Sequence, residues 1–231
     1  WRYFDDFVGP QTNWLPPDNY QETLQVEMAL RTSPTNIGLW LLAVLAARDF
    51  GYLTLDDAIG RTLETLRVTA EMEKYNGHLL NWYNIETLEP LRPRYVSTVD
   101  SGNLLGALTA LESGFRECQN APLLGEAVLD GALDTIAMLE EALHLPDDDW
   151  GNQIADLVQR LKVLLSEQSC SPQQILAHLR QALTLAESLT ACMRPQESNL
   201  KAIAFPQPSA TLDPRQGAVE LNYWVAALEQ Q

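Results

Sequence analysis

Two stretches of the chain are apolar on every side of the helix that each predicts. The first runs from 37 to 47 and the second from 104 to 115. A helix without a polar face has to be covered on all sides. Each stretch follows a cluster of hydrogen-bonding residues, at 31–36 and at 97–103. We therefore expect two buried inner helices that begin in one polar pocket.

The rest of the hydrophobic pattern predicts further helices. Thr54 is placed to begin an amphipathic outer helix, and stripes with helical spacing recur within 154–165 and 175–189. The apolar stripe of the outer helix consists of Ile59, Leu63, Leu66 and Ala70. Inner and outer helices thus alternate, which is typical of an (α/α) barrel. About seven long helices supply little more than half such a ring, so the expected fold is all-α, an incomplete (α/α) barrel or toroid of helical hairpins.

One region breaks the helical pattern. Residues 78–84 have the composition of a strand, Pro90 lies in a turn, and residues 94–97 are expected to return as a second strand. The sequence therefore predicts a short β-hairpin near 79–98.

We interpret residues 1–231 as a single helical module of a longer protein. Its expected parts are a proline- and aromatic-rich wrap at 1–33, helical hairpins at 34–193, a connector at 194–214 and a terminal helix at 215–231.

Charge and composition restrict the partners. The net charge is −16, from 31 acidic and 15 basic residues, and such a surface repels nucleic acids and anionic lipid. The longest apolar run is too short to cross a bilayer, so we expect no direct membrane insertion. Three cysteines and three histidines show no metal-ligand spacing, and we expect neither a metal nor a cofactor.

The polar clusters carry the candidate chemistry. Amides, carboxylates and an arginine beside aromatic rings suit sugars, which offer hydroxyls for hydrogen bonds and C–H faces for stacking. The residues expected to face a sugar are Asp18, Asn19, Arg31, Asn36, Trp82 and Asp100.

Each cluster also has a purely structural interpretation. Ser33 with Pro34 is a helix start, Trp82 suits a buried strand, and Asp100 or Ser101 is placed to cap the second inner helix. Glycoside chemistry needs two carboxylates flanking the bond. Asp18, Glu22 and Asp100 are available, but the sequence assigns no catalytic pair.

Several strings resemble the cyclic β-1,2-glucan synthases. They are LPPDNYQE at 15–22, RTSPTNIG at 31–38, AARDFG at 46–51, NWY at 81–83 and YVSTVDSGNL at 95–104. The resemblance covers residues 1–117, and only a helical pattern is recognised after them. One position departs from the family, because Asn84 stands where an aspartate is usual.

The resemblance implies a place within a large bacterial inner-membrane enzyme, on the cytoplasmic side. It implies the N-terminal part of a glucoamylase-like (α/α) barrel, which closes linear β-1,2-glucan into a ring by transglycosylation. The catalytic glutamates of that barrel would lie outside this chain, so we expect the isolated fragment to be inactive. Its partners would be β-1,2-glucan and the rest of the parent polypeptide.

Two hypotheses follow. In the first, the chain forms part of the glucan-binding wall. In the second, it is a helical scaffold that orders neighbouring domains, and the rings of Trp14, Tyr20 and Trp82 are then buried in packing, whereas a glycan wall leaves one open. Self-association through exposed apolar helix flanks is a further interpretation.

Overall fold

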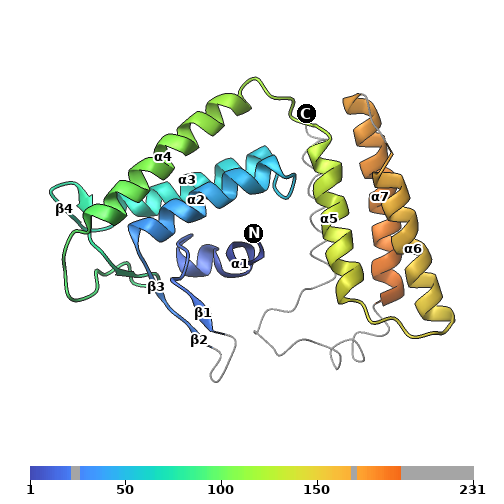
Figure 1. The fold of residues 1–231 in the computed structure, drawn as a ribbon, viewed down its shortest axis with the longest axis horizontal. Coiled ribbons are helices and arrows are strands. Elements are labelled where there is room, and N and C mark those ends of the chain that lie inside the picture. The colour runs from blue at the N-terminus through green and yellow to red at the C-terminus, as the bar shows by residue number, and fades with distance from the viewer. Residues whose placement is uncertain (22–26, 168–170, 194–231) are drawn as a thin grey trace. The chain divides into compact units, whose positions relative to one another are not determined.

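The computed structural model describes residues 1–21, 27–167 and 171–193, and the chain is mostly helical (Figure 1). The expected connector at 194–214 and terminal helix at 215–231 lie outside the described residues, as does Glu22. The chain divides into two compact units, which are described separately: residues 1–49 with 53–122, and residues 50–52 with 123 onward. That all 231 residues form one helical module stays a prediction.

The first unit begins with an aromatic cluster. Within the wrap, helix α1 (Arg2–Phe7) is followed by the 3-10 helix η1 (Pro10–Thr12). The ring of Trp1 stacks on that of Trp40 with centroids 5.9 Å apart, and Phe4 packs on Trp40 at 5.5 Å. The wrap is therefore attached to the helical core through aromatic packing.

Helix α2 (Pro34–Asp49) is the centre of this unit. Its first turn is capped as predicted, because the Asn36 backbone N–H donates to Ser33 Oγ at 3.2 Å. Most of its apolar side chains are buried, with Trp40 fully enclosed, but Leu39 is 54% exposed. The expectation of burial on every side is thus met over most of α2 and is wrong at Leu39.

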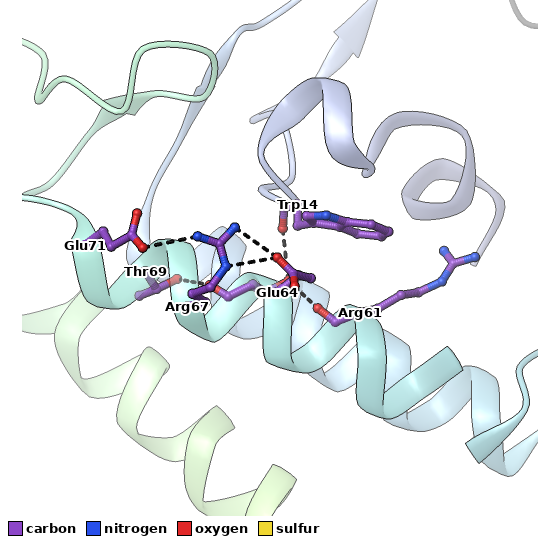
Figure 2. Close-up of polar contacts among 7 residues, drawn as sticks. Trp14, Arg61, Glu64, Arg67, Thr69 and Glu71 are labelled. Atoms are coloured by element: carbon purple, nitrogen blue, oxygen red, sulfur yellow. Dashed lines mark hydrogen bonds and ion pairs between the residues drawn. The ribbon is translucent and has the colours of Figure 1, made fainter. Parts of the chain in front are cut away.

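Helix α3 (Leu55–Glu71) returns along α2 and is capped by Thr54, as predicted. The predicted apolar stripe is wrong, because Leu63 is 60% exposed and Ile59 is exposed too. The buried positions are instead Ala58, Thr62, Thr65 and Val68. Figure 2 shows the polar side of this helix, where Arg67 pairs with Glu64 and Glu71. The buried face carries hydroxyls, which hydropathy alone scores as polar.

Helix α4 (Thr98–Cys118) lies parallel to α2 (Figure 1). Near the start of α2, a Cβ built on Gly38 would lie 2.9 Å from the Cβ of Ala107 in α4. Further along α2, Leu45 fills the space over Gly114, which lies further along α4. Later residues of α2 thus contact later residues of α4, as expected for parallel helices. The expectation that α4 is buried all round is wrong. It buries one face on α2, while Val99 is 71% and Leu105 67% exposed. Self-association through such flanks is not tested by a single chain and stays a prediction.

The strands are short and are not arranged as predicted. Residues 94–97 form no strand, and the hairpin is closed earlier, across the turn at Asn76–Gly77, where both residues have positive φ. Residues 83–84 pair instead with residues 31–32, the segment before α2. The antiparallel pairs are β1 (Tyr20–Gln21) with β2 (Glu27–Met28), β3 (Arg31–Thr32) with β6 (Tyr83–Asn84), and β4 (Lys74–Tyr75) with β5 (His78–Leu79).

The second unit contains α5 (Ala127–Ala142), α6 (Asp149–Leu165) and α7 (Pro172–Met193). Helix α6 packs against α5 and more extensively against α7. The predicted stripes within 154–165 and 175–189 supply most of its core, which confirms them.

The all-α class is confirmed, since the described strands have two residues each. The order α3, α2, α4, with the middle helix buried and α2 and α4 parallel, agrees with an inner and outer arrangement. A barrel or toroid stays a prediction. None of the described helices is both long and apolar enough to span a bilayer.

Candidate functional site

The six predicted sugar-facing residues all belong to the first unit and lie in one connected set of polar contacts. They come from five segments that meet at the N-terminal ends of α2 and α4. Asp18 and Asn19 precede β1, Arg31 lies in β3, Asn36 in the first turn of α2, Trp82 before β6 and Asp100 in the first turn of α4.

Asp18 is held by donors from three directions. Arg31 donates to its Oδ2 through Nη2 at 2.9 Å and Nε at 3.2 Å. Asn19 Nδ2 donates to the same oxygen at 3.1 Å, and Asn36 Nδ2 donates to Oδ1 at 3.2 Å. Charge-assisted bonds of this kind fix geometry well, although an ion pair near the surface adds only about 0–1 kcal/mol. Asp18 thereby joins the segment before β1 to β3 and to the start of α2.

Arg31 connects this carboxylate to an aromatic ring. Its guanidinium carbon lies 4.7 Å from the centroid of the Trp82 ring, and the Trp82 side chain is half-buried. A cation over an aromatic face at a partly exposed site contributes about 0.5–1 kcal/mol. The pairing holds the guanidinium on the ring while its fork faces Asp18.

Asp100 is not the helix cap that the sequence suggested. Ser97 caps α4, since its Oγ accepts from the Asp100 backbone N–H at 3.2 Å. The Asp100 carboxylate is therefore available for contacts between helices, and its Oδ1 accepts from Thr35 Oγ1 at 2.5 Å. Asn103 Nδ2 donates to the same Thr35 hydroxyl at 3.0 Å. These bonds join the first turns of α2 and α4.

Asn81 completes the set from a buried position. Its amide orientation is assigned from the surrounding donors and acceptors. In that orientation the amide nitrogen donates to Asp100 Oδ2 at 3.1 Å, and the amide oxygen accepts from the Tyr95 hydroxyl at 2.8 Å and from Trp82 Nε1. The two groups of contacts, around Asp18 and around Asp100, are thus linked through Trp82.

We call these ten residues the helix-start network: Asp18, Asn19, Arg31, Thr35, Asn36, Asn81, Trp82, Tyr95, Asp100 and Asn103. Thr35 and Asn103 lie in the polar clusters at 31–36 and 97–103, Asn81 opens the NWY string at 81–83, and Tyr95 opens the string at 95–104. None of these four was among the six residues expected to face a sugar. Only their pairing across segments distinguishes them, and one sequence does not contain that information.

The charge of Asp18 also acts on Tyr3, near the start of the wrap. Burial, and secondly the Asp18 carboxylate, raise the pKa of Tyr3 to about 12. The Tyr3 hydroxyl donates to the Pro17 carbonyl at 2.8 Å. The tyrosine is therefore neutral over the physiological range and anchors the residue next to Asp18.

The other sequence-based expectations about the site have mixed outcomes. Asn84 stands where the family usually has an aspartate, and its side chain accepts hydrogen bonds from the backbone N–H groups of Glu86 and Thr87, so it closes a turn.

The rings of Trp14, Tyr20 and Trp82 are all half-buried, which matches neither the fully packed outcome expected of a scaffold nor the open ring expected of a glycan wall. Within residues 1–21, 27–167 and 171–193, no cluster of His, Cys, Asp or Glu could hold a metal ion.

Comparison with known proteins identifies the relationship. No protein-family profile matches the chain. Over 188 residues, 80% of its length, it is 47% identical to the cyclic beta-(1,2)-glucan synthase NdvB of Rhizobium meliloti (strain 1021). The chain belongs to the cyclic β-(1,2)-glucan synthase family. It spans only 6% of the length of that relative. A match of 188 residues also cannot fit within residues 1–117, so the synthase similarity continues into the later helices, further than the strings in the sequence indicated.

Proposed function

We propose that the helix-start network binds β-1,2-glucan as part of the substrate wall of a cyclic β-(1,2)-glucan synthase, in its transglycosylation and cyclisation region. The observation that supports this proposal is the meeting of all six predicted residues at the adjoining N-terminal ends of α2 and α4. The similarity to a cyclic beta-(1,2)-glucan synthase supports the choice of β-1,2-glucan as the sugar.

The chemistry of the network suits a neutral polyhydroxylated ligand. Carboxylates and amides offer acceptors and donors to sugar hydroxyls, and an indole ring offers a surface for the C–H face of a pyranose. Arg31 and Asn103 are exposed, so both can reach a ligand from solvent. A neutral glucan also avoids repulsion by a chain of net charge −16.

The wider setting is part of the same proposal. The chain would act with the rest of its parent polypeptide, on the cytoplasmic side of the bacterial inner membrane. Chemistry would then require carboxylates beyond Asp18 and Asp100, and the isolated chain would bind glucan without converting it.

Isothermal titration with linear β-1,2-gluco-oligosaccharides tests the proposal. The Arg31→Ala/Asp100→Ala double variant is expected to bind at least tenfold more weakly than the unmodified chain. Arg116→Ala is the control, because Arg116 lies in the last turn of the same helix as Asp100 and pairs only with the exposed Glu112 among the described residues. Equal affinity in the double variant and the control would remove the assignment.

A scaffold role is the second candidate, and one observation favours it. The Asp18 carboxylate already accepts four hydrogen bonds from the chain's own side chains. Because its acceptors are already occupied, the network can have a purely structural role, which is to fix the wrap onto α2. In that case Asp18→Asn lowers the melting temperature while glucan of any linkage fails to bind the unmodified chain.

A further inference from the structure

Asn81 is a buried polar side chain in the loop between β5 and β6. It is only 5% exposed, and its backbone N–H donates to the Tyr95 carbonyl at 2.9 Å. The main chain at this position is therefore already tied to the loop before α4. The side chain is free to perform another task, and burying an amide is costly unless all of its polar atoms are satisfied.

The amide is satisfied by groups from three places. Trp82 is its chain neighbour, Tyr95 lies in the loop before α4, and Asp100 lies in the first turn of α4. An amide can do this because it carries a donor and an acceptor on one planar group. An ionised aspartate would keep the acceptor for Trp82 and lose the donor for Asp100, and leucine would lose both.

We infer that Asn81 is the positioning residue of the proposed glucan site, and that it fixes the indole ring of Trp82 relative to the carboxylate of Asp100. The inference rests on the proposed function. It also specifies how Trp82 acts. The only N–H of the indole is engaged by Asn81, so Trp82 contacts a ligand through its ring surface and not through a hydrogen bond.

The Trp82 indole N–H provides a direct readout that needs no ligand. The chain has six tryptophans, so a ¹⁵N-labelled sample gives at most six indole signals, and Trp82→Phe identifies the relevant one. In Asn81→Leu this signal is expected to shift upfield as the hydrogen bond is lost, with the others unchanged. In Asn81→Asp it is expected to stay near its original position.

Titration with β-1,2-gluco-oligosaccharides adds the functional readout. Asn81→Leu is expected to weaken binding at least tenfold. The same substitution in a Trp82→Ala background is expected to weaken binding by less than twofold, because the ring that it positions is gone. A residue needed only for folding would lower the melting temperature in both backgrounds without this loss of additivity.

The two arms separate failure of the inference from failure of the proposed function. An unmoved Trp82 signal in Asn81→Leu, or additive losses in the double variant, overturns the inference. If the unmodified chain does not bind the oligosaccharide, the proposed function fails, and the indole signal alone decides whether Asn81 positions the ring. Should Asn81→Leu not fold, Asn81→Asp replaces it: retained Trp82 signal with tenfold weaker binding supports the inference, and unchanged binding overturns it.

Discussion

A single buried hydroxyl connects three segments of the first unit. Thr65 Oγ1 accepts from Trp40 Nε1 at 2.9 Å, and its own proton faces the carbonyls of Arg61 at 2.8 Å and Trp14 at 3.0 Å. Figure 2 shows two of these partners, with Trp14 lying above the helix that carries Arg61. Thr65 therefore joins α2, α3 and the wrap at a position closed to solvent.

Thr65→Val keeps the shape of the side chain and removes this hydroxyl. It is expected to destabilise the chain by about 2 kcal/mol, because the buried Trp40 N–H loses its acceptor. Urea unfolding followed by circular dichroism measures the change. Thr65→Ser is the matched control, since it keeps the hydroxyl and loses one methyl group, at a cost of about 1 kcal/mol. A smaller loss in the valine variant than in the serine variant would contradict this account.

At the scale of the elements, glycines decide how closely α2 and α4 pack. Gly38 lies at the contact, where an added Cβ would come within 2.9 Å of the Ala107 Cβ. Gly106 lies on the open face of α4, and apart from its own helical turn and chain neighbours no heavy atom of the described residues lies within 4 Å of a Cβ built there. The parallel packing that brings the first turns of both helices together thus depends on the absence of a side chain at position 38.

Alanine substitutions at these two glycines are expected to have opposite effects. Gly106→Ala should stabilise the chain by about 0.5–1 kcal/mol through helix propensity alone. Gly38→Ala gains the same propensity but overpacks the contact, which costs about 1–3 kcal/mol, so a net loss is expected. Chemical denaturation of both variants measures the difference. Stabilisation by both would show that α2 and α4 do not meet closely at Gly38.

Local sequence signals explain which elements could be predicted. Helix starts at Ser33 and Thr54 were correct, because a cap depends on a side chain and a backbone N–H three residues away. The stripe of α3 was wrong, because its buried face includes Thr65, whose burial depends on an indole from another helix. Hydropathy also could not show that α4 buries only one face.

The candidate site was predictable to the same extent. The two polar clusters mark the starts of α2 and α4, and their meeting follows once both helices are packed in parallel. The pairings inside the network could not be derived, since each joins residues from distant segments. In the sequence, Asn81 cannot be distinguished from any other polar residue, because its role depends on the positions of Tyr95 and Asp100 in the fold.

For the molecule as a whole, the net charge makes the unfolding free energy at alkaline pH the most informative stability measurement. The net charge of −16 is already strongly negative, and each tyrosine that ionises adds to the repulsion. Two tyrosines of the first unit resist ionisation in the folded chain. Burial raises the pKa of Tyr83, and burial with the nearby Asp18 carboxylate raises that of Tyr3 from 10.0 to about 12.

The sign of the pH effect follows from these raised pKa values. The folded state holds the Tyr3 proton more tightly than the unfolded state, so Tyr3 contributes stability in full below its unfolded pKa of 10.0. That contribution disappears as the pH rises from about 10 to about 12. The unfolding free energy, measured by urea titration at intervals from pH 8 to 11.5, should fall more steeply in the unmodified chain than in Tyr3→Phe. Both chains share the remaining tyrosines and lysines, so the difference between the two curves isolates Tyr3. Parallel curves would mean that the Tyr3 hydroxyl titrates alike in both states and that the Asp18 charge does not reach it.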